Sequence, residues 1–241
     1  MARERVSATA MPGTAAWRDF ASREDLAAAL ATEVAARLSA AVADRNVAFL
    51  AVSGGATPAR FFRNLSLAGI DWPKVVVTLV DERFVPRTSP RANAGLVRES
   101  LLAGPAAAAR FIDLWQEAPD AGNAAMKADA ALAGLPWPLD VAVLGMGTDG
   151  HTASFFPDAT DRAALDPANP ATVVAVHAQS AGEPRLTLTL PRLAEARFLA
   201  LHIEGAEKRA VLERALSTAP ELPVRRVIDH AAHPVQIYWA P

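Results

Sequence analysis

The sequence of 241 residues contains no cysteine and carries almost no net charge. Without cysteine there is no disulfide, no thiol nucleophile and no thiolate metal ligand, and this absence fits a reducing compartment. The formal charge of −2, from 24 basic and 26 acidic side chains, provides no field that would gather polyanions onto the surface. We therefore expect no nucleic-acid partner.

Targeting and membrane signals are also missing. Residues 1–14 lack the apolar stretch and the small-residue cleavage site of a secretory signal. Proline, arginine or aspartate interrupts each hydrophobic run before the ~20 apolar residues that a membrane span requires. The expected location is the cytoplasm with no membrane partner, and either a monomer or a small homo-oligomer fits the sequence.

The apolar content of 51% is sufficient for one substantial core. We find no repeat and no linker, so the expected organisation is a single domain over residues 1–241, with residues 1–15 as a candidate flexible arm. Residues 103–109 are rich in alanine and fit a helix end or a loop better than a linker.

The order of the apolar patterns predicts the fold class. A helix is expected from Ser22, as its N-cap, to Asp44, because leucine or valine recurs every four residues. Strands buried on both faces are expected at 47–52, 75–80 and 139–144, each followed by polar or glycine-rich residues and then a helix-compatible segment. Further strand-like runs lie at 172–176, 185–190 and 197–203, before a helix at 205–216. This alternation predicts an α/β domain with one doubly wound, mostly parallel sheet and helices on both faces.

A glycine-rich segment, Ser53-Gly54-Gly55-Ala56-Thr57-Pro58, follows the first of these strands. Ligands of open parallel sheets bind beyond the carboxyl ends of the strands, where backbone amides can face an anion. The glycines would let those amides approach a phosphate, and the hydroxyls of Ser53 and Thr57 could donate further hydrogen bonds. A tight strand-to-helix turn without a ligand needs the same residues.

Three charged residues, Asp81-Glu82-Arg83, follow the second strand. Arg83 can donate two parallel hydrogen bonds to a phosphate or to a developing oxyanion. Alternatively, Arg83 forms an internal ion pair with one of the two acids, and Asp81 could cap a helix.

The most specific segment follows the third strand and runs from Gly145 through Gly147, Asp149 and Gly150 to His151. Its glycines permit a loop that other residues could not easily form. A carboxylate two residues before a histidine can fix the imidazole tautomer and stabilise its cation, which suits a base that takes a proton from water.

Other basic groups are less distinctive. Arg185 and Lys208 could complete a phosphate site, or could be solvated, and Lys208 could simply balance nearby glutamates. The remaining histidines lack a comparable glycine and carboxylate setting and are expected to be packing or surface residues: His177, His202, His230 and His233.

Together these segments resemble the 6-phosphogluconolactonase family, which is related in fold to the glucosamine-6-phosphate isomerases and deaminases. The resemblance extends over residues 50–210 with the motifs in the family's order. They are the 53–58 segment, Asp81-Glu82-Arg83 with Val85-Pro86, Asn93, the 145–154 segment, Thr187-Leu188-Thr189-Leu190-Pro191, and Gly205 with Lys208.

The resemblance implies hydrolysis of 6-phospho-D-glucono-1,5-lactone to 6-phospho-D-gluconate in the oxidative pentose phosphate pathway, without a cofactor. It implies that His151 is the general base that activates water, that Asp149 supports it and that Arg83 stabilises the oxyanion with backbone amides near Gly54 or Gly150. The phosphate would be held by Ser53, Gly54, Gly55, Thr57, Arg185 and Lys208. The sequence departs from the family at Ala92, where a serine usually stands, and at Phe155 and Asp158, which replace a leucine and a glycine.

Three other functions could use some of the same motifs. Aminosugar-phosphate deaminases carry a glutamate shortly after the matched histidine and tend to have tyrosine at the position of Arg83, whereas residues 152–157 contain no acid. A non-catalytic sugar-phosphate sensor would need no proton acceptor. A dinucleotide-binding dehydrogenase would need Gly-x-Gly-x-x-Gly after the first strand, and that motif is absent there. Gly145, Gly147 and Gly150 have the same spacing, but they follow a later strand. Five scattered histidines without a His-x-x-x-His pair make a zinc site unexpected.

Overall fold

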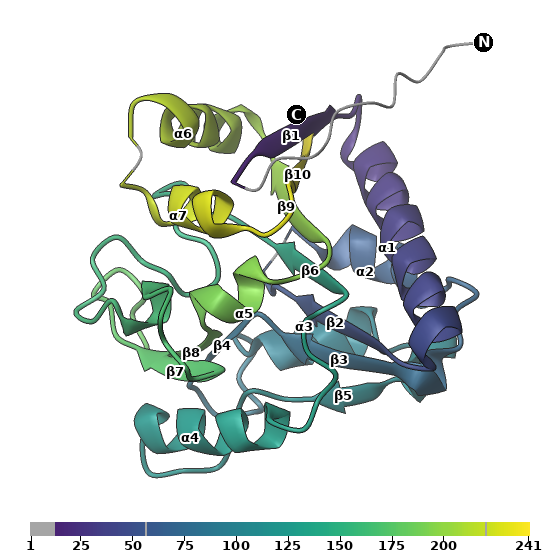
Figure 1. The fold of residues 1–241 in the computed structure, drawn as a ribbon, viewed down its shortest axis with the longest axis horizontal. Coiled ribbons are helices and arrows are strands. Elements are labelled where there is room, and N and C mark those ends of the chain that lie inside the picture. The colour runs from purple at the N-terminus through teal and green to yellow at the C-terminus, as the bar shows by residue number, and fades with distance from the viewer. Residues whose placement is uncertain (1–12, 56, 220) are drawn as a thin grey trace.

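The computed structural model describes residues 13–55, 57–219 and 221–241. A sheet of seven parallel strands runs through the centre of the molecule (Figure 1). In spatial order its strands are β1 (Ala15–Asp19), β10 (Val235–Ala240), β9 (Leu199–Glu204), β6 (Val141–Leu144), β2 (Ala48–Val52), β3 (Val75–Leu79) and β5 (Arg110–Ile112).

The three uninterrupted apolar runs form the middle of this sheet. They become β2, β3 and β6, and every residue in these strands is buried because helices or loops cover both faces. The run at 197–203 becomes β9. The α/β prediction with a mostly parallel sheet is therefore confirmed.

Three strands of the sheet were not predicted: β1, β5 and β10. Strand β1 alternates half-buried with exposed residues, and β5 has only three residues, so neither shows a continuous apolar run. Of the candidate arm over residues 1–15, residues 1–12 lie outside the described residues. Its last residue, Ala15, already belongs to β1 and pairs with Val235 of β10.

Helix α1 (Arg23–Arg45) forms as expected. Ser22 caps it by accepting a hydrogen bond from the amide of Asp25, and its apolar stripe packs against β2, β6 and β10. By length and composition α1 is long and apolar enough to cross a membrane, contrary to our expectation that no segment reaches that length. Its stripe of seven buried residues lies in the core, as in an internal helix of this fold.

The other helices complete the layers. Figure 1 shows α1 and α2 on one side of the sheet, and α5 and α7 on the other. The alanine-rich residues form a short 3-10 helix, Gly104–Ala108. The remaining α-helices are α2 (Ala59–Ser66), α3 (Asn93–Ser100), α4 (Ala121–Leu132), α5 (Leu190–Ala194), α6 (Ala206–Ser217) and α7 (Pro223–His230).

A second, antiparallel sheet is a correction to the expected single sheet. It consists of β4 (Asp81–Arg83), β8 (Arg185–Leu188) and β7 (Val173–Val176), in the order β4-β8-β7, and α4 packs against it. The runs at 172–176 and 185–190 therefore do not join the main sheet, and Leu190 begins α5 instead of ending a strand. This small sheet places Arg83 directly opposite Arg185.

The order of the large sheet also determines where a ligand can bind. Strands β2 and β6 are neighbours, but the chain continues from β2 toward β3 on one side and from β6 toward β9 on the other. A crevice opens beyond the carboxyl ends of strands at such a reversal. Both glycine-rich segments begin there, because Ser53 follows β2 and Gly145 follows β6.

Candidate active site

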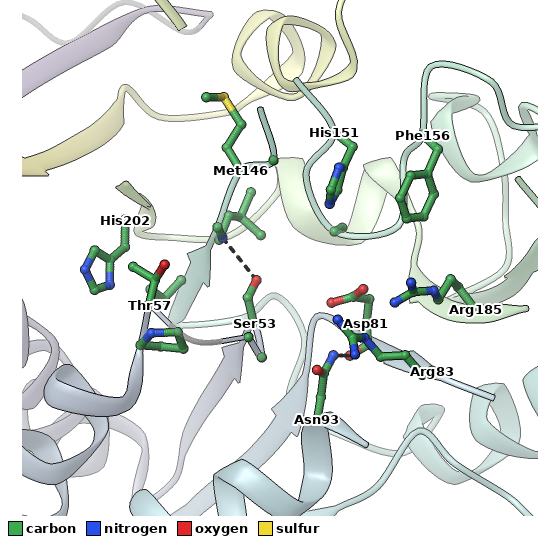
Figure 2. A pocket seen from close by; sticks show the side chains of 18 of the residues that line it. Ser53, Thr57, Asp81, Arg83, Asn93, Met146, His151, Phe156, Arg185 and His202 are labelled. Carbon is green, nitrogen blue, oxygen red and sulfur yellow. Dashed lines mark hydrogen bonds between the residues drawn. The ribbon is translucent and has the colours of Figure 1, made fainter. Parts of the chain in front are cut away.

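A cavity of about 370 Å³ lies at this reversal, between the two glycine-rich segments and the small antiparallel sheet (Figure 2). It is lined by every residue predicted to bind substrate, and by two of the three predicted catalytic residues, Arg83 and His151. The third, Asp149, lies behind His151 and contacts its ring. The structure thus brings together residues that lie more than 150 positions apart in the chain.

The 53–58 segment is attached to the second glycine segment. The hydroxyl oxygen of Ser53 accepts a hydrogen bond from the amide of Gly145, with 3.2 Å between the two atoms, so its own proton remains free to donate to a ligand (Figure 2). Gly55 has φ +94°, a conformation that other residues rarely adopt. Gly54 packs against Asn93 so closely that a Cβ there would clash with its side chain. Ala56 lies outside the described residues.

His151 and Asp149 form the pair that the sequence predicts. The imidazole Nδ1 lies 2.6 Å from Asp149 Oδ1, and the same carboxylate oxygen accepts the His151 amide at 3.1 Å. Burial raises the pKa of Asp149, but these hydrogen bonds from His151 outweigh it, so the pKa is below its usual value. The ionised carboxylate holds Nδ1 as the donor, which leaves Nε2 as the basic nitrogen.

An aromatic ring also packs against the imidazole of His151. The imidazole lies against Phe156 at 4.6 Å between ring centroids, and the guanidinium of Arg185 lies over the same phenyl ring at 5.5 Å. Thr152 closes the loop by donating to the carbonyl of Gly145 at 2.7 Å. The imidazole is therefore oriented by both a carboxylate and an aromatic ring.

Arg83 and Arg185 form one cationic wall of the cavity (Figure 2). Arg83 donates to the carbonyl of Arg91 at 2.8 Å and makes no ion pair with Asp81 or Glu82 within the described residues, so the internal ion-pair alternative was wrong. Burial lowers the pKa of Arg185, and the nearby charge of Arg83 lowers it further. The guanidinium of Arg185 nevertheless stays positively charged at neutral pH. Both side chains have a buried Nε without a partner in the described structure.

Glu82 has a structural role instead. Its carboxylate accepts hydrogen bonds from the amides of Asn93 and Ala94 at 2.7 and 2.8 Å, and thereby caps the N-terminus of α3. The residue at the cap position, Ala92, has no side chain that could do this. Glu82 explains how α3 begins without the serine that the family usually has there.

Glu82 also predicts a dependence of stability on pH. Burial, opposed by the amide hydrogen bonds, raises its pKa from 4.5 to about 7. The folded state therefore binds more protons than the unfolded state between these pH values, so the stabilisation present below pH 4.5 is lost as the pH rises through 7. The loss is at most about 3 kcal/mol. Thermal unfolding at pH 5 and pH 8 should show this decrease.

The variant Glu82→Gln tests the assignment. It should be less stable than wild type overall, because glutamine cannot accept all of these hydrogen bonds, but its stability should change less between pH 5 and pH 8. Glu99→Gln, which changes an exposed glutamate of α3, serves as the control and should keep the wild-type slope. Equal slopes in wild type and Glu82→Gln would contradict the prediction.

Lys208 and His202 also line the cavity, and Figure 2 shows His202 on the opposite side from Arg83 and Arg185. Burial lowers the pKa of Lys208, while Glu204 and Glu207 oppose the shift. His202, expected to be a packing or surface residue, is only 2% exposed, packs edge-on against Phe61 and also lines the cavity. Its Nε2 lies 3.4 Å from Glu204. The other three histidines are exposed, as expected: His177, His230 and His233.

Sequence reasoning missed several lining residues. The sequence indicates only a possible helix cap at Asp81, Asn93 enters only through the family motif, and nothing in the sequence distinguishes Phe156 or Ser180. The unusual Asp158 accepts hydrogen bonds from the amide and hydroxyl of Ser180 and so orders that part of the wall. The cluster of charges just beyond β3 was the one signal that could have identified Asp81.

Within residues 13–55, 57–219 and 221–241, no group of three or more histidine, aspartate or glutamate side chains could hold a metal ion. The polar groups that line the cavity are instead mostly hydrogen-bond donors, which suits an anionic ligand.

Comparisons with known proteins agree with this geometry. Residues 21–239 match the family model of glucosamine-6-phosphate isomerases/6-phosphogluconolactonase. The chain is 56% identical to a 6-phosphogluconolactonase of Mesorhizobium japonicum over the whole length of both, and 54% identical to one of Rhizobium meliloti over 92% of this chain and 97% of the relative. A 6-phosphogluconolactonase structure from Shewanella baltica has a TM-score of 0.90 at 37% identity, with 95% of this chain and 98% of that chain covered. The protein belongs to the glucosamine-6-phosphate isomerase/6-phosphogluconolactonase family.

Proposed function

We propose that the protein is a cytoplasmic enzyme that hydrolyses 6-phospho-D-glucono-1,5-lactone to 6-phospho-D-gluconate in the oxidative pentose phosphate pathway. The observation that carries the proposal is the His151–Asp149 pair at the wall of a cavity that is also lined by the cationic side chains of Arg83, Arg185 and Lys208. Relatives up to 56% identical over their full length bear the name of this activity.

The substrate phosphate binds at the glycine-rich segment. The amides of Gly54 and Gly55 and the hydroxyls of Ser53 and Thr57 are the donors, and Lys208 supplies a positive charge beside them. Arg185 is the second cation. The phosphate anchors carbon 6 of the sugar and leaves the lactone carbonyl to extend toward His151.

His151 acts as the general base. Nε2 removes a proton from water as the oxygen attacks the carbonyl carbon, and Asp149 stabilises the resulting imidazolium. Arg83 and amides near Gly54 or Gly150 stabilise the tetrahedral oxyanion. Collapse of the intermediate breaks the bond to the ring oxygen, which receives the proton from His151. The product is the open-chain acid.

The loop after the histidine supports hydrolysis over deamination. No acidic residue occurs in positions 152–157, and the side chain that packs on the His151 ring is Phe156. The ring opening and proton transfer of a deaminase require an additional acid at this point. Arg83, where such relatives tend to have tyrosine, suits an oxyanion.

The test is acid release from freshly generated 6-phosphoglucono-1,5-lactone, with the spontaneous reaction subtracted and a chelator present. Wild-type protein should accelerate hydrolysis, and glucono-1,5-lactone without the phosphate should be a much poorer substrate because it lacks the anchor. No acceleration, together with release of ammonia from glucosamine 6-phosphate, would replace the proposal by a deaminase.

A further inference from the structure

One carboxylate in the cavity has no role in the mechanism above. Asp81, the first residue of β4, is 8% exposed and lines the cavity. Figure 2 shows its carboxylate pointing into the cavity below His151, beside Arg83 and Arg185. The residue is separated from the end of β3 only by Val80 and so lies at the carboxyl edge of the sheet.

The surrounding structure holds Asp81 in a fixed orientation. The hydroxyl of Ser154 donates to Oδ2 at 2.7 Å, and the side-chain amide of Asn93 donates to the main-chain carbonyl of Asp81 at 2.9 Å. Pairing with Thr187 of β8 fixes the backbone. Both the position and the rotation of the carboxylate are therefore determined before any ligand binds.

The other oxygen, Oδ1, is left for a ligand. Within the described residues no donor forms a hydrogen bond to it, and no arginine, lysine or histidine lies within 4.0 Å of the carboxylate as an ion pair. Arg83 and Arg185 instead donate to the carbonyls of Arg91 and Ala181. Because the carboxylate points into the cavity, a bound ligand can donate a hydrogen bond to this oxygen.

The chemistry of a carboxylate restricts what that ligand can be. It can only accept hydrogen bonds, so it repels a phosphate and would destabilise the oxyanion of the intermediate. It attracts hydroxyl groups. In a hydroxylated lactone, the hydroxyl nearest to the attacked carbonyl is the one on C2, because C1 carries only the carbonyl and the ring oxygen.

We infer that Asp81 is a specificity-determining residue that accepts a hydrogen bond from the C2 hydroxyl of the lactone. The inference rests on the proposed function and deepens it. With the phosphate held at the glycine-rich segment and C1 next to His151, the bond to Asp81 fixes the rotation of the ring between these two points. Lactones without a hydroxyl at C2 are then oriented poorly.

The experiment compares two substrates in wild type and in Asp81→Asn. Fresh 6-phosphoglucono-1,5-lactone and its 2-deoxy analogue are generated by oxidation of the corresponding sugar phosphates. Asparagine can still accept from Ser154, but it presents an amide in place of the free acceptor. We expect wild type to prefer the parent lactone by ~10–10²-fold in kcat/KM, as for loss of one hydrogen bond to a charged group.

Asp81→Asn should lose a similar factor with the parent lactone and change by less than about threefold with the 2-deoxy analogue, because that interaction is already absent. Ser154→Ala removes the hydrogen bond that orients Asp81. It should lose less kcat/KM than Asp81→Asn, and again only with the parent lactone, so it provides a second test if Asp81→Asn folds poorly. Asp71→Asn, at an exposed aspartate paired with Lys74, is the control and should match wild type.

If Asp81→Asn lost the same factor of kcat/KM on both substrates, the inference would be overturned and the proposed function would stay intact. A change in the pH profile of both substrates would do the same, because it would indicate that Asp81 transfers protons. If wild type accelerates neither lactone over the spontaneous reaction, the proposed function fails and the inference fails with it.

Discussion

Replacement of His151 by asparagine is expected to lower kcat by ~10²–10⁴-fold, the usual contribution of a general base, while leaving KM and the melting temperature close to wild type. The side chain is only partly buried and asparagine can still bond to Asp149, so the loop should keep its structure. The proposed phosphate contacts lie on other segments, so substrate binding should persist. Initial rates after subtraction of the spontaneous hydrolysis measure the effect.

Two further variants make this result specific. Asp149→Asn should also lower kcat, because the imidazole loses the partner that fixes its tautomer and stabilises its cation. His177→Asn, at an exposed histidine, should leave the rate unchanged. Full activity in His151→Asn would rule out the proposed base.

The variant Gly147→Ala is expected to reduce kcat by ~10²-fold through displacement of the base. A Cβ at this position would clash with two atoms of the His151 ring and would lie 2.6 Å from the carboxylate of Asp149, so the pair must move. Misplacement of a catalytic group by about 1 Å has an effect of this size. The φ of Gly147 is not positive, so the backbone itself accepts alanine.

The comparison for this prediction is Gly134→Ala, where an added Cβ meets nothing within 4 Å. That variant should have the activity and melting temperature of wild type. If Gly147→Ala unfolds the protein instead of slowing it, or retains full kcat, the close approach of Gly147 to the His151 ring is not what maintains the geometry.

The sequence predicted the centre of the fold better than its edges. Strands β2, β3 and β6 are buried on both faces, so each appears as an apolar run that few other structures would require. The small antiparallel sheet could not be inferred, because β4 consists of three polar residues whose pairing with β8 depends on contacts about 100 positions apart. Hydrophobic periodicity contains no information on such pairing.

The candidate site shows the same division. His151, Asp149 and the glycines were predictable, since a close approach of backbone to ligand or ring requires glycine in any context. The inward orientation of Asp81 was not, because a charged residue after a strand can face solvent equally well. Its position depends on Ser154 and Asn93, which reach it from other segments.

Strand β10 has a consequence for how the chain folds. It lies between β1 and β9, so the first strand of the chain has no place in the sheet until residues about 220 positions later have been synthesised. Loop closure over this distance is slow compared with local helix formation. We expect β1 to remain unpaired throughout synthesis while the segments that contain both glycine loops are already complete, so the catalytic cavity can assemble before the edge of the sheet is closed.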